Sequence, residues 1–277
     1  MHVSGEEGLD AVEPPAATQL ASSDALLSPS IQRLAGEKMA AFEMKFLIGE
    51  AIARQVEAWA AEHMQRDAYA DVANGGAYQT TTLYLDTPQR DVFRRCNGHR
   101  SRKFRLRRYG SESTAYLERK SRKGDRVAKR RSHVPLAELT ALTAQQISDD
   151  WSGAWFRQSV TTQSLLPACR LTYDRTAFVR LAEDWPLRLT LDRRIRGLGT
   201  DAWDLTPLDG GHAILPGQVI CEFKFRVAMP ALFKQVITSL QLEAGSVSKY
   251  RRMMIASGAA PADPVVAAAL GEVRPNA

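Results

Sequence analysis

Charged side chains recur at every second position of several predicted strands. Side chains at positions i and i+2 of a strand point to the same face. Lys103, Arg105 and Arg107 therefore share one face of a predicted strand, and Phe104 and Leu106 occupy the other. The same alternation groups four further sets: Tyr116, Glu118, Lys120 and Arg122; Arg188, Thr190, Asp192 and Arg194; Glu222 and Lys224; Glu43 and Lys45. The sequence predicts a sheet with one apolar face and one charged face.

A face that mixes many cations with isolated carboxylates suits a ligand made of phosphate groups. Clustered Arg and Lys bind phosphate oxygens, and Arg can donate two parallel hydrogen bonds. The carboxylates would repel phosphate unless a divalent cation such as Mg²⁺ or Mn²⁺ lies between them. The chemistry indicated is phosphoryl transfer, which needs positioning and charge stabilisation more than a covalent nucleophile.

An open antiparallel sheet with one face in water shows the same alternation, and the pattern alone fits that arrangement better. Two details favour a closed barrel. Acids recur among the cations of the charged face, at Glu43, Glu118, Asp192 and Glu222. The predicted helices are also numerous enough to cover an apolar outer face, and closure would turn the charged face into a lumen.

The elements that must position these side chains are mostly strands. Strands are expected over 41–48, 77–85, 102–108, 115–122, 125–133, 168–181, 186–195 and 218–226. Gly110 and Gly124 suit tight turns between three of them. Helices are expected over 50–64, shortly after 86–88, and over 135–166, 230–240 and 247–256; Trp151, Trp155 and Phe156 would supply packing. This order predicts an α+β protein with a closed antiparallel β-barrel, a tunnel, and helices packed on its outside.

The composition is that of a globular protein with a basic surplus. A hydrophobic fraction of 44% and a charged fraction of 25% exclude disordered and fibrous classes, and a net charge of +6 suggests an anionic partner. Cys96, Cys169 and Cys221 are widely spaced, so we expect neither disulfides nor a structural zinc site, and a reduced, cytoplasmic protein. No run is long and apolar enough to span a bilayer. We expect a flexible leader at 1–36, one domain at 37–256 and a flexible tail at 257–277.

Six short motifs follow one another along residues 40 to 255. They are Glu43-Met44-Lys45-Phe46, Lys103-Phe104-Arg105-Leu106-Arg107, Leu117-Glu118-Arg119-Lys120, Asp174-Arg175-Thr176-Ala177-Phe178, Cys221-Glu222-Phe223-Lys224 and Ser248-Lys249-Tyr250. In this order they make the chain resemble the VTC domain, the polyphosphate-polymerase branch of the triphosphate tunnel metalloenzyme superfamily. The resemblance implies an antiparallel tunnel barrel that holds a triphosphate or polyphosphate chain.

The resemblance also implies roles for individual residues. Phosphate-binding groups of the catalytic site would be Lys45, Arg105, Arg107, Lys120, Arg175 and Lys249. Glu222 would be the metal-binding carboxylate, with Glu43 and Asp192 as further candidates. The first strand of this superfamily commonly carries an acid-x-acid-x-Lys pattern. Glu43-Met44-Lys45 keeps one acid and the Lys, which resembles the polymerase branch more than the triphosphatase and cyclase branches and leaves the number of metal ions open.

Several further positions keep two interpretations. Arg90 is a candidate for cofactor binding or an exposed helix residue, and one of Lys129 and Arg131 is expected to face the lumen. Asp192 is a second metal ligand or only an ion-pair partner, and Tyr250 is more often a packing residue than a ligand. His99, His133 and His212 have no partner for catalysis and are given no role.

The leading hypothesis is a metal-dependent polyphosphate polymerase that moves a phosphoryl group from ATP or another nucleoside triphosphate to a polyphosphate chain, with Mn²⁺ or Mg²⁺. The alternatives are an inorganic triphosphatase or polyphosphatase, with water as the acceptor, and a polyphosphate-binding module without turnover. No nucleic-acid partner is expected, because the basic residues alternate inside strands and do not form a groove-facing helix with aromatic platforms. Eukaryotic relatives in this family carry membrane segments, and this chain shows none.

Overall fold

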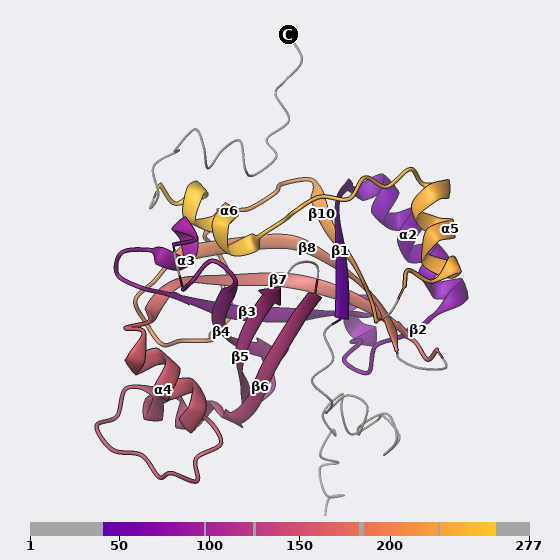
Figure 1. Cartoon of the computed structure of the whole chain (residues 1–277). Helices are drawn as coiled ribbons and strands as arrows, with labels where there is room; N and C mark the ends of the chain where they lie inside the picture. Colours follow the sequence, from indigo (N-terminus) through magenta and orange to yellow (C-terminus); the bar gives the residue numbers. More distant parts are fainter. Residues whose placement is uncertain (1–40, 97, 124–125, 183–185, 227, 259–277) are drawn as a thin grey trace, which may run out of the picture.

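The fold is α+β and rich in antiparallel strands, as expected from the sequence (Figure 1). This computed structural model describes residues 41–258 except 97, 124–125, 183–185 and 227. The expected leader at 1–36 and almost all of the expected tail at 257–277 lie outside the described residues.

Ten strands form one hydrogen-bonded sheet. They are β1 (Ala41–Gly49), β2 (Gln65–Arg66), β3 (Ala77–Asp86), β4 (Arg102–Tyr109), β5 (Thr114–Lys123), β6 (Arg126–Pro135), β7 (Leu166–Arg180), β8 (Leu187–Gly199), β9 (His212–Ala213) and β10 (Gln218–Phe225). Their order is β2-β7-β3-β4-β5-β6-β1-β10-β8-β9, and β7 also pairs with β8. All strands except β2 and β9 therefore form a closed cycle of pairings, which we call the strand ring.

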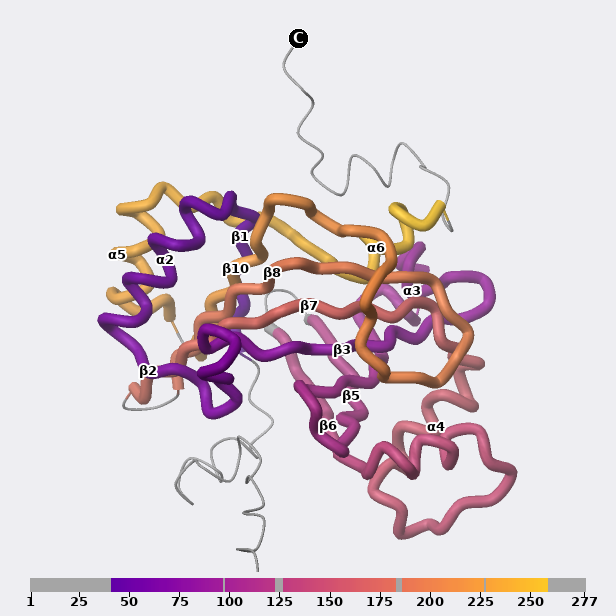
Figure 2. The backbone as a smooth tube through the Cα atoms, turned by 180° about the vertical axis from the view of Figure 1, so that it is seen from behind, coloured from indigo at the N-terminus to yellow at the C-terminus, as the bar shows by residue number. Residues whose placement is uncertain are grey.

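The helices are short. They are α2 (Glu50–His63), α3 (Asp91–Arg94), α4 (Ala154–Thr162), α5 (Ala231–Ser239) and α6 (Lys249–Ala256), with 3-10 turns at η1 (Val72–Asn74) and η2 (Leu136–Leu142). Of these, α2, α4 and α5 lie outside the strand ring (Figure 2), whereas α6 packs on side chains of its inner face. Within the described residues, no helix has the length and apolar character that crossing a membrane requires.

The expectation that residues 135–166 are helical is confirmed only in part. Only η2 and α4 are helical there. The segment between them contains Ser148, Asp149, Asp150, Ser152 and Gly153. Ser and Asp favour turns because their side chains compete for backbone hydrogen bonds, and Gly loses more backbone freedom in a helix than other residues.

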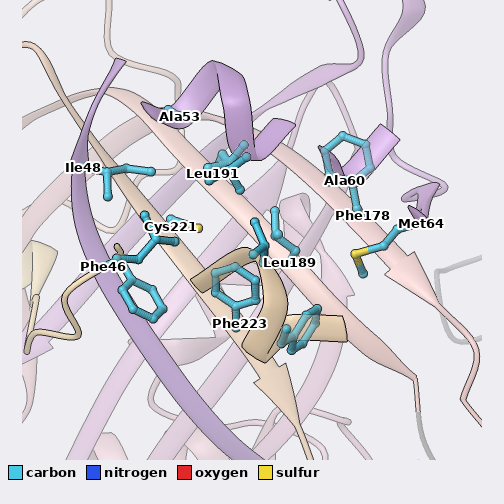
Figure 3. Close-up of a cluster of buried hydrophobic side chains, with 14 of the residues drawn as sticks. Phe46, Ile48, Ala53, Ala60, Met64, Phe178, Leu189, Leu191, Cys221 and Phe223 are labelled. Carbon is cyan, nitrogen blue, oxygen red and sulfur yellow. The ribbon is translucent and has the colours of Figure 1, made fainter. Parts of the chain in front are cut away.

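The outer face of the strand ring is apolar, and α2, α4 and α5 cover it. One cluster joins β1, β7, β8 and β10 to α2 and α5 around Phe46, Leu189 and Phe223 (Figure 3). A second lies between β3–β5 and the segment containing η2 and α4, around Phe104 and Leu117. Because neighbours along a strand point to opposite faces, this packing directs the charged side chains to the inside of the ring.

Candidate functional site

The first group of inner side chains links β1, β5 and β10. Lys45 Nζ lies 2.9 Å from a Glu43 oxygen and 2.7 Å from a Glu222 oxygen. Lys120 Nζ lies 2.5 Å from Glu43, and Lys224 Nζ lies 3.0 Å from Glu222 and 3.5 Å from Glu43. Both carboxylates thus contact Lys45 and Lys224, and only Glu43 contacts Lys120. We call these five residues the Glu43 cluster.

The surrounding cations keep both carboxylates of this cluster ionised. Burial and the charge of Glu222 would raise the pKa of Glu43, but Lys224, Lys120 and Lys45 outweigh them and bring it to about 2. Burial would also raise the pKa of Glu222, and the ammonium groups, led by Lys224, hold it well below its usual value. At neutral pH both groups are therefore poor proton acceptors.

A second group surrounds Glu118 of β5, whose side chain has no exposed surface. Arg105 Nε and Arg131 Nε each donate a hydrogen bond of 2.7 Å to it, one to each carboxylate oxygen, and Lys129 Nζ lies at 3.5 Å. Burial would raise the pKa of Glu118, but Arg105 and the other cations lower it well below its usual value. One carboxylate therefore holds three cations in place.

The third group surrounds Asp192 of β8, which is 1% exposed. Arg175 of β7 donates two hydrogen bonds to it, from Nε at 2.6 Å and from Nη2 at 2.8 Å, and Lys249 of α6 also contacts it. Both cations lie over the ring of Tyr173, with distances to its centre of 5.5 Å for Arg175 and 4.6 Å for Lys249. Burial opposes ionisation of Asp192, yet Arg175 and Lys249 lower its pKa.

Two inner cations have no carboxylate within ion-pair distance among the described residues. Arg107, 4% exposed, donates a 3.2 Å hydrogen bond to Thr82 Oγ1. Lys103 donates a 2.9 Å hydrogen bond to Ser248 Oγ, at the N-cap of α6. Burial, followed by the charge of Lys120, lowers the pKa of Lys103 to about 7. An anion between these strands would therefore find donors that no acid already holds.

Tyrosines line part of the same interior. Tyr109 accepts a 2.9 Å hydrogen bond from Arg131 Nη2, and Tyr78 accepts one of 3.2 Å from Arg188 Nη2. Arg188 also pairs at 2.9 Å with Asp67, in the loop after β2. Sequence reasoning missed three residues of the interior: Arg188, Lys224 and Lys103. The predicted charged faces include them, but only their contacts in the structure distinguish them from strand residues that point into water.

The interior carries a clear excess of positive charge. Its cations are Lys45, Lys103, Arg105, Arg107, Lys120, Lys129, Arg131, Arg175, Arg188, Lys224 and Lys249. Its acids are Glu43, Asp67, Glu118, Asp192 and Glu222. Cations thus outnumber acids by about two to one. A polyanion would relieve the resulting repulsion.

The structure brings together most of the residues that the sequence singles out. The six expected phosphate-binding residues, Lys129, Arg131 and all three carboxylates lie in the groups described above. Arg90 is the N-cap residue of α3, with a φ of 62°, and makes none of these ion pairs. Tyr250 is buried and donates a hydrogen bond to Asp86, a packing role.

Arg194 was expected on the charged face, and this prediction is wrong. The pairing of β7 with β8 shifts register between Thr172 and Asp174, and Arg194 has a φ of 49°. Its side chain is 64% exposed and pairs with Asp174. A bulge reverses the alternation of faces at this point, which the sequence pattern alone does not reveal.

The candidate metal ligands do not form one group. Among the described residues, no set of three or more His, Cys, Asp and Glu side chains is arranged to hold a metal ion. Glu43 and Glu222 share Lys45, whereas both oxygens of Asp192 are held by Arg175 and Lys249. A divalent cation at the Glu43–Glu222 pair would need further oxygen ligands from water and phosphate, which is how Mg²⁺ usually binds.

Most of the inner cations pair with inner carboxylates or tyrosines. Two cavities of about 240 and 230 Å³ lie elsewhere, and neither is lined by the clustered cations and carboxylates. The larger is lined by residues such as Leu142 and Trp203, near α4. A ligand that binds the paired Arg and Lys would replace carboxylates, an exchange for which phosphate oxygens are suited.

Comparisons with known proteins identify one family. The model of the VTC domain matches residues 40–257. No curated protein gives a significant match to the sequence. Similar solved structures include a candidate adenylate cyclase from Bacillus halodurans, with 13% identity, a TM-score of 0.48, and coverage of 76% of this chain and 94% of that one. Another is a candidate adenylyl cyclase from Hippeastrum with a dominant triphosphatase activity, with 13% identity, a TM-score of 0.45, and coverage of 78% and 95%.

Proposed function

The chain belongs to the VTC domain family, and from this premise we propose that it is a metal-dependent polyphosphate polymerase of the cytoplasm. It would transfer a phosphoryl group from ATP or another nucleoside triphosphate to a polyphosphate chain. The observation that carries the proposal is the surplus of cations on the inner face of the strand ring. The three free cysteines, two of them buried, support a reducing compartment.

In this proposal the strand ring is a closed barrel and its interior is the tunnel that holds the phosphate chain. Lys45, Arg105, Arg107, Lys120, Arg175 and Lys249 bind the phosphates. Their positions on β1, β4, β5, β7 and α6 would surround a chain with donors. Lys129 and Arg131 extend this set. Arg90, which makes none of the interior ion pairs, is a weaker candidate. Cations fixed by Glu118 and Asp192 are preorganised to stabilise charge on the group in transfer.

The divalent cation is proposed to bind at Glu43 and Glu222. Both are ionised and face one another across Lys45, and hard cations such as Mn²⁺ and Mg²⁺ prefer such oxygens. When bound, the cation would neutralise charge on the phosphates of the substrate. Lys45 and Lys224 would then turn from the carboxylates towards phosphate oxygens. Asp192 remains a second candidate, although Arg175 and Lys249 already hold it.

The identity of the acceptor decides between polymerisation and hydrolysis. The end of a polyphosphate chain carries oxygens that are ionised at neutral pH, so it can attack without a general base. Water is helped by a base, and the low pKa values of Glu43, Glu118 and Asp192 make them poor bases. These three carboxylates therefore do not supply the base that water would need, and hydrolysis is the runner-up.

A product analysis tests the proposal. The purified chain is incubated with ATP and Mn²⁺, and the products are separated on a gel stained for polyphosphate. Long polyphosphate supports the polymerase, and free phosphate without polymer supports the triphosphatase or polyphosphatase. Tight, salt-sensitive binding of polyphosphate without turnover would indicate a binding module.

The metal site is tested by Glu222→Gln. This change keeps the shape of the side chain but removes a charge, so we expect loss of metal-dependent turnover and a retained fold, checked by circular dichroism. Arg194→Gln is the matched control, because its side chain lies outside the interior and its activity should stay unchanged. Full activity of Glu222→Gln would show that the metal binds elsewhere.

A further inference from the structure

Two threonine hydroxyls on the inner face of the strand ring are buried and form no hydrogen bond with the described residues. Thr80 of β3 is 0% exposed and Thr190 of β8 is 1% exposed, and the Oγ1 atom of each has no partner there. Thr80 shares its face of β3 with Thr82, which accepts a hydrogen bond from Arg107. Thr190 shares its face of β8 with Asp192. Both hydroxyls therefore belong to the charged interior.

A buried hydroxyl without a partner lowers the stability of a folded chain. Folding removes it from water, and most buried polar groups regain a hydrogen bond inside the protein. Thr81, the neighbour of Thr80 on the outer face, shows this usual arrangement, because its Oγ1 lies 3.4 Å from that of Thr172. Valine at position 80 or 190 would have a similar shape and no unpaired group. The two inner hydroxyls are thus available to a ligand that accepts hydrogen bonds.

The two hydroxyls lie on either side of Arg175 in the order of the strands. On β3, Tyr78 is directly opposite Arg175, and Thr80 follows it by two residues on the same face. On β8, Asp192 is directly opposite Arg175, and Thr190 precedes it by two residues. Diagonal neighbours of this kind are about 7–8 Å apart, a distance that a long side chain and one small ligand group can bridge.

Arg175 has one terminal nitrogen that its carboxylate partner does not use. Its two hydrogen bonds to Asp192 come from Nε and Nη2, and Nη1 makes none with the described residues. A phosphate group could therefore bind Nη1 while Asp192 stays in place. Thr190 is also directly opposite Glu222 of β10. A phosphate group held here would lie beside the carboxylate at which the divalent cation is proposed to bind.

We propose that Thr80, Arg175 and Thr190 form a subsite for one phosphate group of the chain, in which Arg175 supplies the charge and both hydroxyls supply uncharged hydrogen bonds. The hydroxyls donate to non-bridging phosphate oxygens and thereby fix the orientation of the group. The proposal deepens the proposed function, because it rests on a phosphate chain as the ligand. It assigns the two threonines as residues that set specificity for a tetrahedral group rich in acceptors.

Substitutions that differ only in the hydroxyl test this subsite. Thr80→Val and Thr190→Val remove it, and Thr80→Ser and Thr190→Ser keep it. Thr81→Val is the matched control, because it removes a hydroxyl that has a partner, one residue along β3 and on the opposite face. For each variant, calorimetric titration gives the affinity for tripolyphosphate, and thermal unfolding gives the stability of the free protein.

The expected result combines weaker binding with undiminished stability. We expect each valine variant to lose about three- to tenfold in affinity, which corresponds to one ordinary hydrogen bond. Its unfolding temperature without ligand should stay the same or rise, because an unpaired buried group is removed. The serine variants should keep most of the affinity. Thr81→Val should show the reverse, with a lower unfolding temperature and unchanged affinity.

Salt separates the hydroxyls from the charged groups of the interior. The affinity lost in Thr80→Val should be the same factor at about 50 and about 300 mM salt, because a hydroxyl carries no charge for ions to screen. The factor lost in Lys129→Met should shrink at the higher concentration. A loss in Thr80→Val that shrank in the same way would mean that the substitution acts through displaced charges, and the subsite would be wrong.

Other results also overturn the proposal. Unchanged affinity in the valine variants would mean that the hydroxyls bind water and not phosphate, and a loss in only one of them would rule out a group held from both sides. Weaker binding together with a lower unfolding temperature would show that the hydroxyls support the fold. Serine variants as weak as the valine variants would show that the hydroxyl is not the binding group. If the unchanged chain does not bind tripolyphosphate, the proposed function fails with the subsite, whereas binding that the valine variants retain in full removes the subsite alone.

Discussion

The two faces of the strand ring differ in what their side chains contribute to stability, although the same strands form both. On β10, Phe223 points outward and packs against Phe46 and Phe233, with ring centres 5.5 and 4.7 Å away. Its neighbours Glu222 and Lys224 point inward into the Glu43 cluster. The outer face gains free energy by removing apolar surface from water. The inner face holds charges out of water, and ion pairs only partly offset that cost.

The difference shows why this fold needs helices outside and why the proposed anionic ligand would suit the inside. Cations on the inner face exceed the carboxylates, so the free protein contains repulsion that folding alone does not remove. The outer clusters must supply the stability that keeps these charges in place. An anionic ligand should then stabilise the fold as well as bind, because it binds the folded chain only.

The largest expected effect is on the outer face. Phe223→Ala removes a fully buried ring that contacts Phe46 and Phe233. We expect the free energy of unfolding to fall by about 3–5 kcal/mol, from lost burial and the cavity left behind. Urea unfolding measures the loss. Leu166→Ala is the control, because its side chain is exposed and should cost little.

This variant also tests the separation of the two faces. Where the protein is still folded, its affinity for tripolyphosphate should stay close to that of the unchanged chain. A large loss of affinity in a folded Phe223→Ala protein would mean that the outer packing sets the positions of the inner cations.

A somewhat smaller effect is expected from Glu118→Gln on the inner face. The change leaves Arg105, Arg131 and Lys129 without their carboxylate. Removing one partner of a buried ion pair costs about 3–5 kcal/mol, and we expect the lower end because these cations retain partial access to water. Thermal unfolding with and without tripolyphosphate gives the second readout.

The ligand should raise the unfolding temperature of Glu118→Gln more than that of the unchanged protein. Phosphate oxygens would replace the missing carboxylate, which is the property that distinguishes the inner face from the outer one. An equal or smaller rise would mean that Arg105 and Arg131 do not meet the ligand.

The alternating pattern predicted most of the strands because each strand has one buried apolar face. The first strand shows this pattern: apolar Phe42, Met44 and Phe46 alternate with charged Glu43 and Lys45. A period of two residues fits a strand and not a helix. Three features were not predicted. β2 and β9 have two residues each, too few for any period, and the break between η2 and α4 depends on turn-forming residues inside an otherwise apolar stretch.

The sequence predicted which side chains share a face of a strand, but not which of them form hydrogen bonds or ion pairs with one another. The spacing shows that Lys103 and Arg105 share a face. It does not show that Arg105 is paired with Glu118 while Lys103 has only Ser248. That difference depends on which strands are neighbours and in which register, information that lies in long-range pairing. The bulge that turns Arg194 outward has the same origin.

The smallest expected effect is on the number of protons that the protein takes up when a phosphate ligand binds. It distinguishes the inner cations that pair with a carboxylate from those that do not. In the free protein, burial and Lys120 bring the pKa of Lys103 to about 7. A bound phosphate would favour the ammonium form and raise this pKa. At pH 8 binding should therefore take up protons, and affinity should fall as pH rises above about 7. Lys120 and Lys129, with pKa values of about 8, and Tyr109, at about 7, shift in the same direction.

Calorimetric titration with tripolyphosphate in two buffers of different ionisation enthalpy measures this uptake. Lys103→Met should reduce it by a fraction of one proton, and the remainder belongs to the other three groups. The slope of affinity against pH should fall in parallel, by less than tenfold per pH unit, the limit for one titrating group. Arg107→Met is the matched control, because it removes an inner cation that stays charged at every pH tested, and it should weaken binding without changing the proton count. An unchanged proton count in Lys103→Met would show that Lys103 does not change its protonation state when the ligand binds.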